Sequence, residues 1–308
     1  MNKTHILLIA ATLFAAPAAV SAQTCPTGAQ YDTTGGGCVM RAFDRTRGEL
    51  SPHTQAPTAD SMEATLRAGA APSDLTTMLE YGERVECLAC IPLLENEILT
   101  NPDATVRELA AWWLRRRPLG FGAVMHEMSS VLATDTNAVR RERAAAAIGE
   151  FMDPNGVAHL GQAITSDTAA NVRAAAVRGI ARINASTGLA FISMALGDHD
   201  ASVQEAALSV ILRVNFFSDT SSVLPLLAAP DAGLRRHAAS IVGSLHATDS
   251  VRVLAAMLSG DTDRGARGAA AWALGQIGGA AAQTALAAAQ TTEHDTLVLD
   301  AISNALHR

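Results

Sequence analysis

The chain repeats one short pattern of residues seven times, and this internal repeat constrains the fold more than any other feature. The clearest copy begins at Asp263 and continues with Ala266-Arg267, Ala270, Leu274-Gly275 and Ile277-Gly278. With the Arg of this copy as a marker, the copies fall 34, 32, 31, 31, 32 and 32 residues apart, at positions 107, 141, 173, 204, 235, 267 and 299. A repeat period of about 20–50 residues indicates stacked supersecondary units, each packed mainly against its neighbours.

Each copy has the properties of one amphipathic helix. Four residues before the marker, an Asp or Asn stands where a helix N-cap accepts hydrogen bonds from the first free amides, at positions 103, 137, 200, 231, 263 and 295. Ala169 takes this place in the third copy, so we expect the helix there to begin less sharply. Apolar residues recur at helical spacing, as in Val106, Ala110, Trp113 and Leu114, and predict the buried face.

A shorter apolar run precedes most of these helices, at residues 91–98, 124–132, 189–196, 223–227 and 251–258. Each repeat is therefore expected to contain helix A, a turn with an acid or Asn, and helix B. Gly149, Gly243 and Gly275 lie inside the helix B pattern, where Gly costs about 1 kcal/mol relative to Ala. We expect these glycines at close crossings between helices.

The pattern Asp-x-x-Val-Arg-x-x-Ala-x-x-Ala-Leu-Gly-x-Ile-Gly resembles the HEAT repeat, in the bacterial form also found in phycobilisome lyases. The resemblance covers residues 85–308 and implies an all-α fold, a right-handed α-α superhelix (HEAT-like solenoid) of about seven helix pairs. It further implies a ladder between repeats formed by the pattern's Asp and Arg, and this role falls on Asp103/Arg107, Asp231/Arg235 and Asp263/Arg267. Gln204 and Leu299 replace the Arg, so the ladder should be interrupted there.

One row of helix B positions points away from the predicted core. These positions lie two, six and ten residues after the pattern's Val: 108/112/116, 142/146/150, 174/178/182, 205/209/213, 236/240/244, 268/272/276 and 300/304/308. The family resemblance implies that the second helices line the concave face. We therefore expect the row to bind a protein or peptide partner, with Trp112, Arg116, Arg178, Arg182, Arg213, Arg236 and Trp272 as the candidate contact residues.

Two features of this row have a structural alternative. Trp112 and Trp272 occupy the same repeat position, and each can fold over the adjacent repeat instead of contacting a partner. Six arginines crowd two neighbouring helices B and could attract an acidic partner: Arg115, Arg116, Arg117, Arg140, Arg141 and Arg143. Residues 115–117 also end a helix, where positive charge complements the helix dipole, and we favour that structural interpretation.

The start of the sequence has the order of a signal peptide. A single Lys3 precedes an uncharged apolar run at 6–20, and the small residues Ser21-Ala22 follow. We expect a signal peptide at 1–22, a flexible segment with a disulfide loop at 23–60 and a HEAT-like repeat solenoid at 61–308. This organisation predicts a periplasmic or secreted protein in an oxidising compartment, with no membrane insertion.

Four cysteines, Cys25, Cys38, Cys87 and Cys90, allow three disulfide connectivities. Cys25 and Cys38 bracket a polar, Gly-rich stretch that suggests a disulfide-closed loop. For Cys87 and Cys90 we favour a local structural disulfide near a helix start; buried thiols or a redox pair are the alternatives. The residues near this pair in sequence offer no second Cys pair or paired His to complete a zinc site.

The remaining features argue against catalysis and against nucleic-acid binding. The net charge is −7, whereas nucleic-acid binding needs a basic surface. Deoxyhypusine hydroxylase, a HEAT-like enzyme, builds its iron site from several His-Glu pairs, and only His126-Glu127 matches here. We therefore predict an exported, non-enzymatic scaffold that binds a protein or peptide, without cofactor and as a monomer. The alternative is a metal- or redox-active HEAT-like protein using Cys87/Cys90 or His126/Glu127.

Overall fold

The computed structural model describes residues 29–32, 37–40 and 57–307, and the chain divides into two units, Met1–Ala56 and Pro57–Arg308. In the first unit, strands β1 (Ala29–Asp32) and β2 (Gly37–Met40) pair antiparallel, with Tyr31 opposite Cys38. The sequence analysis did not predict this hairpin. Residues 1–22 and Cys25 lie outside the described residues, so the signal peptide and the bond between Cys25 and Cys38 stay predictions.

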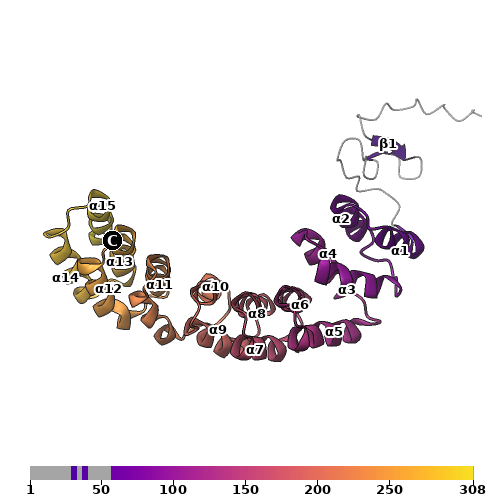
Figure 1. Cartoon of the computed structure of the whole chain (residues 1–308). Coiled ribbons are helices and arrows are strands. Elements are labelled where there is room, and N and C mark those ends of the chain that lie inside the picture. Colours follow the sequence, from indigo (N-terminus) through magenta and orange to yellow (C-terminus); the bar gives the residue numbers. More distant parts are fainter. Residues whose placement is uncertain (1–28, 33–36, 41–56, 308) are drawn as a thin grey trace, which may run out of the picture. The chain divides into compact units, whose positions relative to one another are not determined.

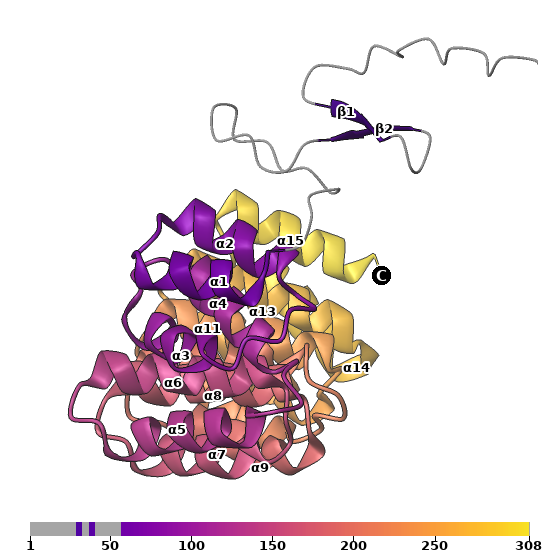
Figure 2. The same cartoon turned by 90° about the vertical axis from the view of Figure 1, so that its right-hand side faces the viewer.

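The second unit is a stack of helix pairs in two layers (Figures 1 and 2). The first helices of the pairs form one layer: α1 (Ala59–Arg67), α3 (Cys90–Thr100), α5 (Phe121–Thr134), α7 (Gly156–Ser166), α9 (Leu189–Leu196), the 3-10 helix η3 (Leu224–Ala228), α12 (Val251–Gly260) and α14 (Gly279–Gln290). The second helices form the other: α2 (Pro72–Tyr81), α4 (Ala104–Leu114), α6 (Ala138–Phe151), α8 (Ala170–Ile183), α10 (Ala201–Ile211), α11 (Ala232–Ser244), α13 (Arg264–Ile277) and α15 (Thr296–Leu306).

These elements confirm the predicted all-α solenoid. The seven helices B that carry the marker position are α4, α6, α8, α10, α11, α13 and α15. The pair α1 and α2, which lacks the marker, precedes them. Short 3-10 turns at Ser186–Gly188, Thr220–Ser222 and Thr248–Ser250 lead into three of the first-layer elements. Among the described residues, no helix is long and apolar enough to cross a membrane.

In α10, α13 and α15, two acids two residues apart precede the helix and order its start. In α13, the Asp263 side chain accepts a hydrogen bond from the amide of Ala266 at 2.8 Å, as the predicted N-cap should. Asp261 in turn accepts from the amide of Asp263 at 2.9 Å and holds the turn. Asp167 does the same for the amide of Ala169 at 2.8 Å, and α8 begins at Ala170 as its register requires. As expected, Ala169 provides no side-chain cap for α8, and the earlier acid Asp167 orders the turn in its place.

The marker arginines form the ladder between repeats, but with other acids than expected. Arg235 contacts both carboxylate oxygens of Asp261, at 2.6 and 2.7 Å, and Arg267 contacts those of Glu293, at 2.7 and 3.1 Å. Each acid lies in the next repeat, two residues before that repeat's N-cap. Asp231 and Asp263 instead cap their own helices, so their predicted ladder role was wrong.

The ladder is interrupted at two places in the described stack. Gln204 donates to the carbonyl of Asp198 at 2.7 Å and makes no ion pair, which confirms the interruption predicted there. The first-layer element that follows is η3, a 3-10 helix with Pro225 at its start. Arg107 donates to the carbonyls of Asn101 and Pro102, both at 2.8 Å, so the expected pair of Asp103 and Arg107 does not form.

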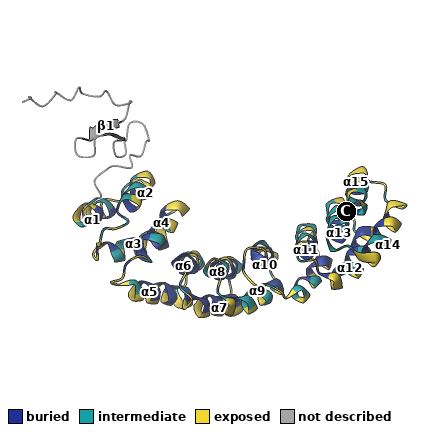
Figure 3. Cartoon of the chain, turned by 180° about the vertical axis from the view of Figure 1, so that it is seen from behind, coloured by how far each residue is buried: buried dark blue, intermediate teal, exposed yellow. Residues whose placement is uncertain are grey.

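The core lies between the two layers (Figure 3). Val106, Ala110, Trp113 and Leu114 of the first marked repeat are fully buried, as predicted. The expected close crossings are present as well. A Cβ on Gly149 would stand 2.5 Å from the Cα of Gly179, and Cβ atoms on Gly243 and Gly275 would meet the helix of the next repeat at 2.8 and 2.7 Å.

Candidate partner-binding groove

A groove of about 420 Å³ opens on the helix B side of the stack, and we call it the helix-B groove. It is lined by Glu108, Glu142, Ala146, Glu150, Ala175, Arg178, Gly179, Ala181, Arg182, Ser209, Val210 and Arg213. Most of these side chains belong to the outward row read from the sequence and come from α4, α6, α8 and α10. The small residues Ala146, Ala175, Gly179 and Ala181 leave its floor open. The predicted register of the row is thus correct, and its partner role stays a prediction.

Three of the seven candidate contact residues meet in this groove. Arg178 and Arg182 stand one turn apart on α8, and Arg213 follows the end of α10. All three side chains are exposed. Arg182 binds Glu150, Nε to Oε1 at 2.6 Å. Arg178 and Arg213 have neither an ion pair nor a hydrogen bond among the described residues, which leaves their guanidinium groups available to a ligand.

Glu150 is the buried carboxylate of the groove, with a residue exposure of 8%. Burial raises the pKa of Glu150 above its ordinary value, while the ion pair with Arg182 opposes that shift. Glu142 accepts a hydrogen bond from the neutral amide of Asn171 at 2.7 Å and makes no ion pair among the described residues. Glu108, Glu142 and Glu150 lay in the predicted row, but the sequence analysis did not assign them to the site.

The other four candidate residues lie elsewhere on the stack. Arg116 covers the ring of Trp112 at 4.3 Å and forms an ion pair with Glu83. Trp272 is partly buried and its Cζ3 atom lies 2.8 Å from where a Cβ on Gly243 would stand, so this ring packs over the preceding repeat.

Arg236 is exposed on α11, and its Nε lies 3.9 Å from the Asp263 carboxylate. The structure therefore does not bring the seven residues into one site.

The cluster of six arginines has structural partners throughout. The Arg117 side chain is buried, stacks on Trp113 at 4.1 Å and donates to the carbonyls of Glu83 and Val85. Arg115 donates to the carbonyl of Glu150 at 2.9 Å and Arg143 to that of Leu99 at 2.9 Å.

The remaining three pair with acids. Arg116 binds Glu83, Arg140 binds Asp135 at 2.7 Å and Arg141 binds Asp167 at 2.7 Å. These contacts support the structural interpretation of the cluster.

The alternative metal or redox site would use Cys87/Cys90 or His126/Glu127, which lie at the start of α3 and on α5. Cys87 and Cys90 form a disulfide at the start of α3, as favoured from the sequence, and both residues are buried. His126 and Glu127 are exposed on α5. Within the described residues, no group of three or more His, Cys, Asp or Glu side chains could hold a metal ion.

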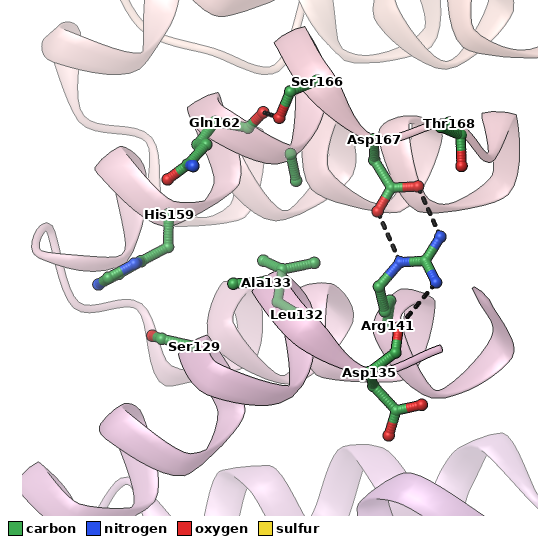
Figure 4. A pocket seen from close by; sticks show the side chains of 11 residues that line it. Ser129, Leu132, Ala133, Asp135, Arg141, His159, Gln162, Ser166, Asp167 and Thr168 are labelled. Carbon is green, nitrogen blue, oxygen red and sulfur yellow. Dashed lines mark hydrogen bonds and ion pairs between the residues drawn. The ribbon is translucent and has the colours of Figure 1, made fainter. Parts of the chain in front are cut away.

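A second pocket, of about 300 Å³, lies between α5 and α7 in the first layer (Figure 4). Ser129, His159 and Gln162 line one part of it, and the hydroxyl of Ser129 is buried without a hydrogen-bond partner among the described residues. Its Arg141 is bound to Asp167 and to the carbonyl of Asp135. The sequence analysis missed this pocket because its residues come from three separate segments and form no motif.

The stacked helix pairs place this protein in the class of α-α solenoid proteins, and its groove lies across the second helices. The sequence pattern of the HEAT repeats family matches residues 125–212 and 220–307, more than half of the chain. The chain belongs to the HEAT-repeat family, which confirms the resemblance. Residues 213–219, between Gln204 and η3, separate the two matched segments.

One of the solved structures that match this chain supports the fold, with a TM-score above 0.5. YibA of Escherichia coli is 14% identical over 83% of this chain and 98% of its own, with a TM-score of 0.52. Human deoxyhypusine hydroxylase is 20% identical over 81% of this chain and 94% of its own, with a TM-score of 0.36. The complex of CpcE and CpcF of phycocyanin lyase from Nostoc sp. PCC7120 matches at 17% identity over 83% and 96%, with a TM-score of 0.34. At 14% identity, the likeness to YibA concerns the fold alone. A comparison with curated proteins finds no match.

Proposed function

We propose that this protein is an exported, non-enzymatic scaffold that holds a segment of a partner protein in the helix-B groove. The observation that carries the proposal is the pair Arg178 and Arg213. Both are exposed on neighbouring helices, both face the groove, and neither has an acid partner among the described residues. The marker arginines Arg141, Arg173, Arg235 and Arg267, by contrast, are bound to ladder acids.

The groove suits a polypeptide better than a small molecule. It runs over several helices and is lined by charged residues and small apolar ones. Small-molecule sites are concave and mostly apolar, and they bury most of the ligand. Stacked repeats instead present extended concave surfaces, which is how solenoid proteins bind partners.

Partner capture by the purified mature protein tests this proposal. Arg178→Glu combined with Arg213→Glu reverses two groove charges, and we expect it to abolish recovery of the partner. Arg84→Glu with Arg252→Glu is the matched control, because both residues are exposed, unpaired among the described residues and outside the groove. Equal recovery by both double variants would remove the groove from the function. Trp112→Ala and Trp272→Ala test whether either ring takes part.

Export is a separate part of the proposal and has its own test. The intact mass of the protein purified from its native compartment should correspond to a chain that begins at Gln23. A mass that includes residues 1–22 contradicts export by signal cleavage.

A further inference from the structure

The charges of the helix-B groove are divided by helix. Glu108 comes from α4, and Glu142 and Glu150 come from α6. Arg178 and Arg182 come from α8, and Arg213 from the end of α10. Three carboxylates thus lie on one side of the groove and three guanidinium groups on the other.

The boundary between the two sides is neutralised within the protein. Glu150 of α6 and Arg182 of α8 form an ion pair at 2.6 Å, in which the Glu150 side chain is 11% exposed. Removing the Arg182 charge would leave the Glu150 carboxylate partly desolvated, whereas Arg182 itself is 54% exposed. The pair contributes no net charge to the groove.

The other four charged groups of the groove form no ion pair among the described residues. Glu108 makes no ion pair in the described chain, and Glu142 accepts a hydrogen bond only from the amide of Asn171, with the Arg143 charge near enough to interact with it. Arg178 and Arg213 make none either. The α4–α6 side is left negative and the α8–α10 side positive, although the six charged groups sum to zero.

This division excludes a uniformly charged ligand. A polyanion such as a nucleic acid or an anionic glycan meets the arginines favourably but meets Glu108 and Glu142 with like charge. A uniformly basic segment has the opposite difficulty. Electrostatic complementarity at interfaces sets which partners are accepted and in which register.

We propose that the occupant of the groove is an extended, dipolar peptide segment, with basic residues over Glu108 and Glu142 and acidic residues over Arg178 and Arg213. Packed helices lie about 8–10 Å apart, and an extended chain advances about 3.3 Å per residue. The two charged sides are separated by about two helix spacings, so the basic and acidic residues stand about five residues apart. This inference rests on the proposed function and names the chemistry of the partner.

Fluorescence anisotropy with synthetic peptides tests the inference on the full mature chain. One labelled peptide carries two lysines at one end and two glutamates at the other, separated by about five glycine and serine residues. This split-charge peptide is made in both chain orders. A second has the same composition with alternating charges. Two further peptides carry only lysines or only glutamates at the charged positions. We expect one order of the split-charge peptide to bind at least about tenfold more tightly than the alternating one, and binding to weaken as salt is raised.

Groove variants complete the design. Arg178→Glu with Arg213→Glu should lose the preference for the split-charge peptide and gain affinity for the all-lysine peptide, whereas Arg84→Glu with Arg252→Glu should keep the original preference. Circular dichroism confirms that each variant is folded. Equal affinity for the split and alternating peptides, tighter binding of a uniformly charged peptide, or no peptide binding at all overturns the inference. If the groove variant still fails to capture the partner in these cases, the proposed function stands and only the dipolar occupant is wrong.

Discussion

Arg173 and Asp198 form a two-point ion pair between neighbouring repeats, with Nε to Oδ2 at 2.7 Å and Nη2 to Oδ1 at 2.8 Å. Both side chains are nearly buried, at 5% and 7% exposure. The same guanidinium donates to the carbonyl of Asp167 at 3.0 Å, so it joins its own repeat's turn to the next one. Asp198 in turn holds the amide of Asp200, the N-cap of α10, at 2.8 Å.

Arg173→Ala should destabilise the stack strongly, because it leaves the Asp198 carboxylate buried without its counter-charge. Breaking a buried ion pair by removing one partner costs about 3–5 kcal/mol. Urea unfolding followed by circular dichroism measures the difference. The control Arg252→Ala, on the exposed side of α12, should change the free energy of unfolding by less than about 0.5 kcal/mol. Similar losses in the two variants would show that the ladder does not hold the repeats together.

The acids of the ladder could not be predicted from the sequence. The spacing of the repeat predicted the N-caps, the helix B register and the buried face, because these depend on residues within one turn of each other. The ladder acid is separated from its arginine by 25 or 26 residues in the pairs from Arg141, Arg173, Arg235 and Arg267. Its identification needs the stacking of two repeats in space. The family resemblance predicted the ladder arginines Arg235 and Arg267 correctly, but it assigned them the wrong acids, Asp231 and Asp263.

Acid should weaken the ion pair between Arg267 and Glu293, which is the last pair of the ladder. Arg267 holds the pKa of the Glu293 carboxyl at about 2, below its ordinary value of 4.5. A carboxylate with a lowered pKa stabilises the fold above the unfolded pKa, and this contribution is lost as the pH falls. We therefore expect the free energy of unfolding to decrease as the pH falls from about 4.5 towards 2.

Thermal unfolding at pH 6 and pH 3 measures this effect in the wild type and in Glu293→Gln. The variant, which has no carboxylate to protonate at this position, should lose less of its Tm between the two pH values. Identical losses in both proteins would mean that Glu293 does not sense pH in the native fold.

Two Gly→Ala changes should have opposite effects on stability, because Gly149 lies at the close crossing of α6 and α8 and Gly268 lies in open space on α13. A Cβ on Gly149 would lie 2.5 Å from the Cα of Gly179, and a backbone atom cannot turn aside as a flexible side chain can. We expect Gly149→Ala to cost about 1–3 kcal/mol by overpacking. Gly268 has open space where a Cβ would stand, so Gly268→Ala should stabilise α13 by about 0.5–1 kcal/mol. Chemical denaturation of both variants provides the comparison, and a neutral Gly149→Ala would contradict the close contact.

The sequence predicted the helix B positions that line the groove, but not which of its charged side chains are free. The outward row gave its register, and Arg178, Arg182 and Arg213 were named from it. Their selection rested on residue type, which also picked Trp112, a ring that lies under Arg116 beside Glu83. The structure shows which arginines are already bound and which are free, and that distinction depends on side-chain contacts between repeats. The short pair α1 and α2 was missed because it carries no marker arginine.

Photocross-linking from single positions tests the central claim, that the helix-B groove holds the partner. A photoreactive amino acid is placed at Ser209, in the groove on α10, or at Ala256, exposed on α12 in the other layer, in cells that produce the protein. We predict one discrete cross-linked partner from position 209 that disappears when Arg178 and Arg213 are changed to Glu, and none from position 256. The same partner from both positions, or from 256 alone, would contradict the claim.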